Sequence, residues 1–192
     1  MMRLLGLKRI CVAAFLLVLV GCGSGNDARF LMDPPAPAQQ FKLRVGRIEL
    51  REVSLPAYAA SPEIAMQDES GALRNLPDAL WADDPVRGMT SALARSLDEA
   101  SDAVVAAEPW PLDAPADLRI EVRIDRMLAR ADGQFELSGQ YAYYAPSGAG
   151  RGVLERFAIS VPVQTEGTGG VAAAAGTATS ALAAEILTRL SL

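Results

Sequence analysis

Chemically reactive side chains are scarce in this sequence, which limits the reactions that it could carry out. The chain has 192 residues and no histidine, and its only lysines are Lys8 and Lys42. A serine or cysteine nucleophile needs an adjacent base, which is most often an imidazole or an amine. Ser54, Ser61 and Ser70 therefore lack the usual activating group, and histidine-based zinc sites are excluded. We expect no catalytic residues, no bound metal ion and no cofactor.

The N-terminus has the pattern of a targeting segment. Three basic residues precede an unbroken apolar run over residues 10–20. The run is shorter than the roughly 20 residues that a membrane-spanning helix needs, so it is typical of the apolar part of a signal peptide. We predict a signal peptide over residues 1–21.

Leu19-Val20-Gly21-Cys22 resembles the lipobox of bacterial lipoprotein signals. A small residue before the cut fits the peptidase, and the cysteine thiol carries the diacylglycerol. Cys22 is then the lipid attachment site, and its acyl chains anchor the protein stably at about 0.8 kcal/mol per buried methylene. The alternative is an ordinary signal peptide with an incidental cysteine. Gly23 stands where an aspartate would favour inner-membrane retention, which points to the periplasmic face of the outer membrane.

Composition limits the class of protein and the kinds of partner that the rest of the chain allows. Half of the residues are apolar and a fifth are charged, which is typical of a globular protein. The formal net charge is -5, and basic residues do not cluster, so nucleic acid is not an expected partner. Residues 22–40 are rich in Gly, Pro, Ala and Asp and predict a lipidated, flexible to semi-extended tether. Residues 41–192 are expected to form one periplasmic domain.

Hydrophobic periodicity predicts an α/β domain with a mixed sheet and two main helices. The alternation from Phe41 to Leu50 changes phase at Gly46, which predicts one long bulged strand that ends by Pro56. Asp83-Asp84-Pro85 is a helix start, with an aspartate at the cap and proline at the first helical position. The other expected elements are a hairpin over 62–76, a helix over 85–100, a short strand at 104–105, strands over 118–125, 135–143 and 153–161, and an Ala-rich helix over 171–190.

Four large or stiff residues stand out as candidates for an interface: Leu55, Pro56, Tyr58 and Trp81. Tyrosine and tryptophan are enriched at the centres of protein interfaces. The alternative is that they fill the core or anchor turns. For Tyr58 both interpretations stay open, whereas for Trp81 we favour packing at the helix entry.

These features together resemble the PqiC (YmbA-like) family of auxiliary lipoproteins of ABC-type, MCE-linked transport systems. The resemblance rests on the lipobox, the Pro-rich segment, Val53-Ser54-Leu55-Pro56-Ala57-Tyr58, Leu80-Trp81-Ala82-Asp83-Asp84, and Ser180-Ala181-Leu182 with Glu185-Ile186 in the last helix. Family members usually continue Leu-Pro-x-Tyr with a Leu-Asp-Arg-Pro-like stretch. Here Ala59-Ala60-Ser61-Pro62 follows, so the proline matches and the two charges do not.

The resemblance implies a subunit of a lipid-trafficking assembly that works beside an MCE protein, a permease and an ATPase. It also implies a fold like that of the N-terminal domain of TolB, an architecture similar to anticodon-binding domains. Self-association into a homo-oligomer is a further expectation. The alternatives are a module that binds lipid or glycolipid itself, or an outer-membrane assembly partner resembling LptE. An apolar cavity large enough for an acyl chain would favour the binding module, and a solid core with an exposed aromatic patch near Tyr58 would favour docking.

Overall fold

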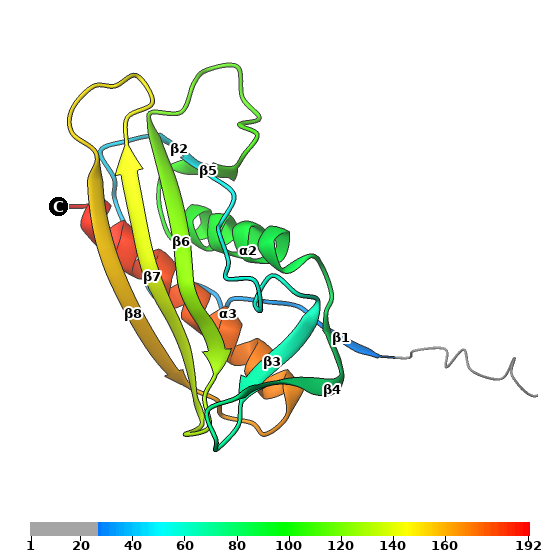
Figure 1. Cartoon of the computed structure of the whole chain (residues 1–192). Coiled ribbons are helices and arrows are strands. Elements are labelled where there is room, and N and C mark those ends of the chain that lie inside the picture. Colours follow the sequence, from blue (N-terminus) through cyan, green and yellow to red (C-terminus); the bar gives the residue numbers. More distant parts are fainter. Residues whose placement is uncertain (1–26) are drawn as a thin grey trace, which may run out of the picture.

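A computed structural model describes residues 27–192 as one eight-stranded mixed sheet with two helices on one of its faces (Figure 1). The predicted signal peptide and Cys22 lie outside the described residues. The elements in chain order are β1 (Ala28–Phe30), β2 (Arg47–Leu50), β3 (Glu63–Gln67), β4 (Leu73–Trp81), α2 (Pro85–Glu99), β5 (Val104–Ala107), β6 (Leu118–Ala129), β7 (Gln134–Tyr144), β8 (Val153–Pro162) and α3 (Thr168–Leu190).

Strand β6 is the centre of the sheet. Along one edge it pairs with β7, and β7 pairs with β8, both antiparallel. The other edge is shared by two strands, because β2 runs parallel to its first part and β3 pairs with its last residue. The remaining strands extend the order to β1-β4-β3-β6-β2-β5. The predicted mixed sheet with two main helices is therefore confirmed.

Helix α2 begins where its sequence predicts. The carboxylate of Asp84 accepts the backbone N–H of Arg87 at 3.0 Å, and Pro85 occupies the first turn. An aspartate cap satisfies a backbone donor that the helix itself cannot, and proline has no N–H to satisfy. The buried face of α2 contributes Met89 and Leu93 to the core.

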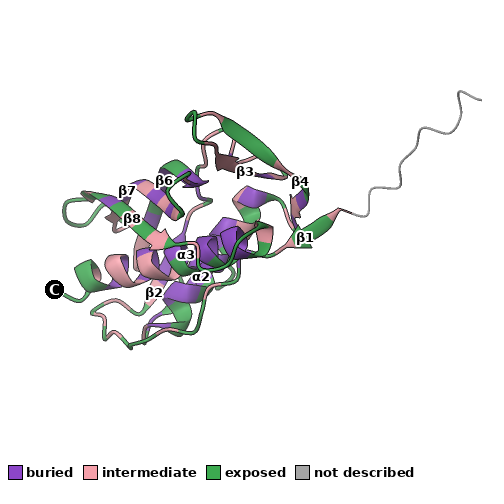
Figure 2. Ribbon diagram, turned by 90° about the horizontal axis from the view of Figure 1, so that it is seen from below, coloured by how far each residue is buried: buried purple, intermediate pink, exposed green. Residues whose placement is uncertain are grey.

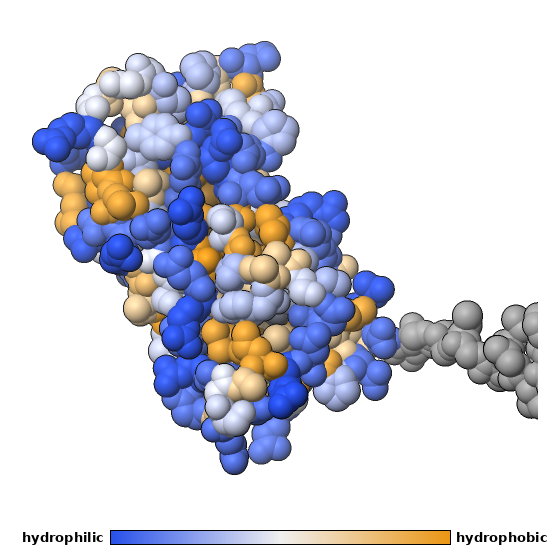
Figure 3. Space-filling view, in the orientation of Figure 1, coloured by the Kyte–Doolittle hydropathy of each residue, from blue (hydrophilic) through white to orange (hydrophobic). Residues whose placement is uncertain are grey.

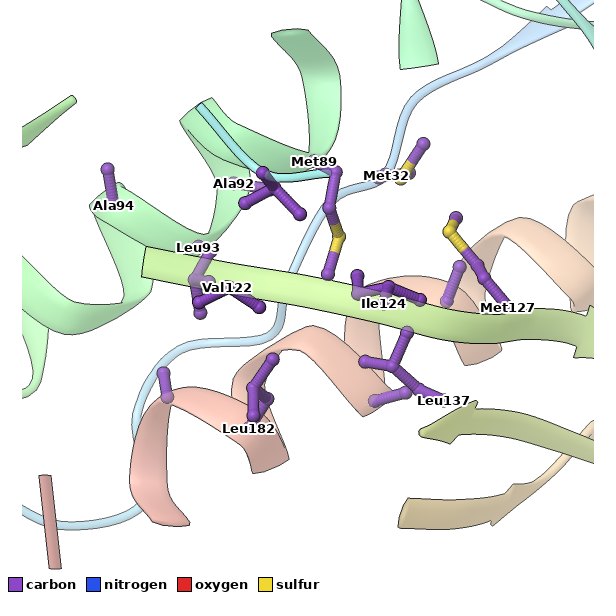
Figure 4. Packing of buried hydrophobic residues seen from close by; sticks show 14 of the residues in the cluster. Met32, Met89, Ala92, Leu93, Ala94, Val122, Ile124, Met127, Leu137 and Leu182 are labelled. Atoms are coloured by element: carbon purple, nitrogen blue, oxygen red, sulfur yellow. The ribbon is translucent and has the colours of Figure 1, made fainter. Parts of the chain in front are cut away.

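The core lies between the sheet and the two helices. Figure 4 shows side chains of α2, β6, β7 and α3 converging there, among them Leu93, Val122, Ile124, Leu137 and Leu182, all of which are buried. Figure 2 shows the same segregation, with buried residues concentrated along the helices and the adjoining strand faces. Truncating such a buried leucine to alanine typically costs 2–5 kcal/mol, so this layer holds the fold together.

Helix α3 is an apolar core helix. By length and composition it could cross a membrane, but 67% of its most apolar 18-residue window is buried inside the domain. Its many alanines allow close approach to the sheet and to α2, as the sequence predicts. It begins at Thr168, three residues earlier than the periodicity indicates.

The predicted long first strand is only partly present. Regular strand is limited to β2, while Phe41 makes a single parallel bridge with Ser101. Between them, Leu43 and Gly46 donate their backbone N–H groups to the carboxylates of Asp102 and Asp117. Apolar alternation indicates an extended backbone, but it does not reveal whether the partner is a strand or a side chain.

The Pro-rich segment before residue 41 differs from the expected free tether. Within it, β1 pairs parallel with β4, and Met32 is buried in the core. Asp33 forms an ion pair with Arg95 at 2.7 Å, and Gln40 donates to the carbonyl oxygen of Glu99 at 2.6 Å. We call residues 28–41 the strap, because they cross the helices and are fixed to them.

Candidate functional site

The loop over residues 55–62 contains three of the residues that the sequence singles out. Leu55, Pro56 and Tyr58 are half-buried, and Leu55 and Tyr58 pack against the core. The backbone N–H of Ala59 donates to the carbonyl oxygen of Pro56 at 2.9 Å, so the loop begins with one tight turn. This turn brings the ring of Tyr58 to the edge of β6.

The hydroxyl of Tyr58 completes the hydrogen bonding along that edge. It accepts the backbone N–H of Met127 at 3.0 Å. On one side of this contact β6 is bridged to Ser54, and on the other side it pairs with β3 through Met66 and Ala129. A side-chain oxygen thus takes the place of a strand carbonyl. Since an unpaired buried N–H costs about 1–3 kcal/mol, this contact gives Tyr58 a structural role.

Trp81 is a core residue and not a surface anchor. It is only 6% exposed, at the end of β4. Trp81 and Tyr58 border the same internal hollow of about 10 Å³, together with Phe135 and Val171. The structure therefore brings the two aromatic residues together but directs both toward the interior. Ala57, in the same turn as Tyr58, is exposed, and an interface role for this loop stays a prediction.

The sheet face opposite the helices carries a network of charged side chains, and in Figure 3 this side of the molecule is a mixture of blue, pale and orange areas. Glu49 of β2 and Arg119 of β6 lie opposite each other and form an ion pair at 2.6 Å. Glu49 is only 5% exposed, and its hydrogen bond raises the pKa of Arg119 above the ordinary value. On the same face, Tyr144 donates its hydroxyl to Glu121 at 2.7 Å.

Sequence reasoning does not single out Glu49. Glu49 alternates with the apolar residues Ile48 and Leu50, so the sequence predicts that it faces solvent. Only the pairing of β2 with β6 shows that Arg119 covers Glu49. An acidic residue between two aliphatic residues of a strand is the signal that could have found it.

A shallow hollow of about 440 Å³ lies beside this network. It is lined by Arg51, Glu52, Ser54, Glu108, Glu121, Val122, Arg123, Gln140, Ala142 and Leu154. Arg51 and Glu108 form an ion pair at 2.8 Å across it. Its mixed charges suit contact with a polar surface, and no imidazole is available to activate Ser54. Within residues 27–192, no cluster of three or more acidic side chains could hold a metal ion.

A second groove, of about 320 Å³, is mainly apolar. The strap contributes Pro35, Pro37 and Phe41 to its walls, and α3 contributes Ala181 and Ala184. Its volume is at the lower end of the range of about 300–1,000 Å³ that small-molecule sites occupy.

Tyr141 supplies no base for chemistry. Its hydroxyl is buried and has no hydrogen-bond partner within residues 27–192. Burial raises its pKa to about 12, and the neighbouring carboxylates of Glu185 and Glu155 act in the same direction. Burial also raises the pKa of Glu185. The tyrosine therefore stays neutral at physiological pH.

Comparison with solved structures places the fold among known proteins. One relative is the crystal structure of an uncharacterised protein, with 17% identity and a TM-score of 0.65, covering 81% of this chain and 99% of that one. Another is protein XCC0632 from Xanthomonas campestris, of family DUF330, with 19% identity and a TM-score of 0.63, covering 84% and 92%. At these identities the likeness shows the fold alone. No curated protein matches the sequence.

The sequence itself matches one family model, described as the ABC-type transport auxiliary lipoprotein component, over residues 30–187. The match covers nearly all of the described chain, and it includes most of the strap, the loop over residues 55–62, the charged sheet face, α2 and most of α3. The expected resemblance is thus confirmed. The chain belongs to the family of ABC-type transport auxiliary lipoprotein components, which includes the PqiC (YmbA-like) proteins.

Proposed function

We propose that the protein is acylated on Cys22, is held on the periplasmic face of the outer membrane, and docks an ABC-type lipid transport system through its globular domain. The family match carries this proposal, because it assigns the domain to the auxiliary lipoprotein components of ABC-type transport. The partners would be an MCE protein, a permease and an ATPase, all supplied by other chains. The family is one of transport components and not a class of enzymes, which agrees with the scarcity of reactive side chains.

The packing of the domain supports docking over storage of a lipid in its interior. The hollow beside Tyr58 and Trp81 is about 10 Å³, which is the size that holds one water molecule. An acyl chain needs a pocket of several hundred Å³. A solid interior is the property expected of a domain that works through its surface.

The loop over residues 55–62 is the docking element that we propose. Ala57 is its best probe, because it is exposed and Tyr58 is occupied by its bond to Met127. Ala57→Arg adds a long charged side chain to the loop surface without removing a structural contact. We expect it to weaken binding to the cognate MCE protein at least tenfold, measured with purified components.

Ala158→Arg is the matched control, since Ala158 is equally an exposed alanine but lies on β8. Both variants should keep the melting temperature of the wild type. If both variants bound the MCE protein equally well, the docking surface would lie outside this loop.

One observation favours a second function, the binding of a lipid. The apolar groove between the strap and α3 has a volume of about 320 Å³, which would hold part of an acyl chain. Ala181→Trp would fill it. If the wild type carried stoichiometric lipid after purification and this variant did not, the protein would be a lipid-binding module.

A further inference from the structure

The fixed strap limits the distance between Cys22 and the domain. Composition assigns residues 22–40 to the tether, but Ala28 already pairs with Ala79 of β4. Cys22 lies six positions before Ala28. A fully extended chain spans at most 3.3–3.6 Å per residue, so these six positions reach at most about 20 Å.

This reach is small compared with the domain. A compact chain of this size has a radius of gyration of about 15 Å and is therefore roughly 40 Å across. If Cys22 is embedded in a bilayer, the start of β1 cannot be further from the headgroups than about half the width of the domain. An orientation in which only the opposite end of the domain rests on the bilayer is then excluded, because β1 would lie about 40 Å from the headgroups.

We infer that the surface around β1 faces the lipid headgroups of the bilayer that carries Cys22, so that the domain has one fixed membrane-proximal side. This inference rests on the acylation of Cys22 that the proposed function contains. We call this surface the anchor face and define it by residues 28–33, the helix entry 82–87 and Arg95.

The side chains of the anchor face suit a headgroup layer. Leu31 is 67% exposed beside the end of β1, next to the exposed Arg29. Leu31 and Arg95 help to line a surface hollow of about 160 Å³. The ion pairs Asp33–Arg95 and Asp83–Arg87 lie around it and are largely open to solvent. An exposed aliphatic residue among arginines and carboxylates can enter the headgroup layer while the charged groups stay at its polar surface.

The C-terminus marks the opposite end of the domain. In two views at right angles, β1 and the C-terminus lie at opposite sides of the molecule (Figures 1 and 2). Leu192, at this end, is 80% exposed. Leu31 and Leu192 are therefore a matched pair of exposed leucines, of which only Leu31 lies on the anchor face.

Headgroup quenching of a fluorescent label tests the inference. Leu31→Cys and Leu192→Cys are each prepared as the full acylated protein in vesicles that contain spin-labelled headgroups. Cys22 carries lipid and Cys11 is removed with the signal peptide, so each introduced thiol is the only site for the label. We expect the label at residue 31 to be quenched at least threefold more strongly than the label at residue 192.

A variant with a longer linker tests whether the short distance from Cys22 causes the strong quenching at residue 31. Inserting a Gly/Ser segment of roughly 20 residues after Gly23, with an average span of about 25 Å, should lower the quenching at residue 31 toward that at residue 192. Equal quenching at both positions without the linker, or unchanged quenching at residue 31 with it, would overturn the inference. The mass of the N-terminal peptide is measured on the same samples. An unacylated Cys22 would refute the proposed function as well, whereas an acylated Cys22 with equal quenching would refute only the orientation.

Discussion

The strap and the loop over residues 55–62 make an informative comparison, because neither contains a helix or a long strand and both are fixed to the domain. The strap is held by close approach of its backbone to α3 and by the pairing of β1 with β4. The loop is held by packing of Leu55 and Tyr58 against the core, and by the Tyr58 hydroxyl, which accepts the N–H of Met127. At its end, the backbone N–H of Trp81 donates to the carbonyl oxygen of Pro62. Steric fit should therefore dominate the stability of the strap, whereas the ring and the hydroxyl of Tyr58 should both contribute to the stability of the loop.

The largest effect is expected where α3 touches the strap. A Cβ atom on Gly176 would overlap the backbone carbonyl of Asp33. Gly176→Ala should therefore force the strap or the helix to move and destabilise the protein by about 3 kcal/mol or more, the upper end of the cost of overpacking. Chemical denaturation measures this change in the free energy of unfolding.

Gly88 is the matched control, because a Cβ atom there would meet only the Asp83 side chain at 4.0 Å. Gly88→Ala should stabilise α2 by up to about 1 kcal/mol through helix propensity. If Gly176→Ala stabilised the protein as Gly88→Ala does, the close approach of the strap would not be a constraint.

The next largest effect concerns the loop. Tyr58→Ala removes a half-buried ring together with its hydroxyl, and we expect a loss of about 2–3 kcal/mol in the free energy of unfolding. Hydrogen exchange should locate the loss at Met127 and in β3, since these positions depend on the loop. If Tyr58→Ala accelerated hydrogen exchange only in the strap, Tyr58 would stabilise the strap and not the loop, and the prediction would be wrong.

A smaller effect isolates the hydroxyl. Tyr58→Phe keeps the ring but leaves the N–H of Met127 without its partner, so a loss of about 1 kcal/mol is expected. Tyr144→Phe provides the control, because the bond from Tyr144 to Glu121 lies on the exposed sheet face. Equal melting temperatures for the two variants would mean that the Tyr58 hydroxyl adds little to the loop.

The smallest effect is a dependence on pH within the loop. The hydroxyl of Ser61 hydrogen-bonds to the carboxylate of Glu63 and lowers its pKa below the ordinary value of 4.5. The bond therefore stabilises the folded state above pH 4.5, and this contribution is lost as the pH falls through the lowered pKa. Ser61→Ala should remove this part of the acid sensitivity and leave the strap unchanged. Acid titrations of the melting temperature that coincide for both proteins would contradict this assignment.

Some features could be predicted from the sequence because their causes are local. Asp84 and Pro85 determine the start of α2 through cap chemistry within four residues. The alternation along β6 predicts its strand and its hairpin with β7, although β6 continues to Ala129, beyond the predicted end at residue 125. The hydrogen-bonding partner of Asp84 lies three residues away, and β6 pairs with the strand that follows it across a single turn.

The strap could not be predicted, because its partners are distant in sequence. Proline-rich composition indicates an extended chain but does not reveal that Ala28 will pair with Ala79, or that Gly176 leaves room for Asp33. Tyr58 and Trp81 stand out in the sequence as large aromatic residues beside a turn and a helix start. Which way they face depends on Met127 and on the core, and the sequence leaves both interpretations open for Tyr58.

We propose that this domain is the docking subunit of an ABC-type lipid transport system. The most direct measurement is quantitative mass spectrometry of the transporter isolated from its native membranes through a tag on the cognate MCE protein. We expect the acylated protein to be recovered in a fixed ratio to the MCE protein. Ala57→Arg should lower this ratio, whereas Ala158→Arg should not. Recovery at background level, from membranes in which the acylated protein is abundant, would contradict it.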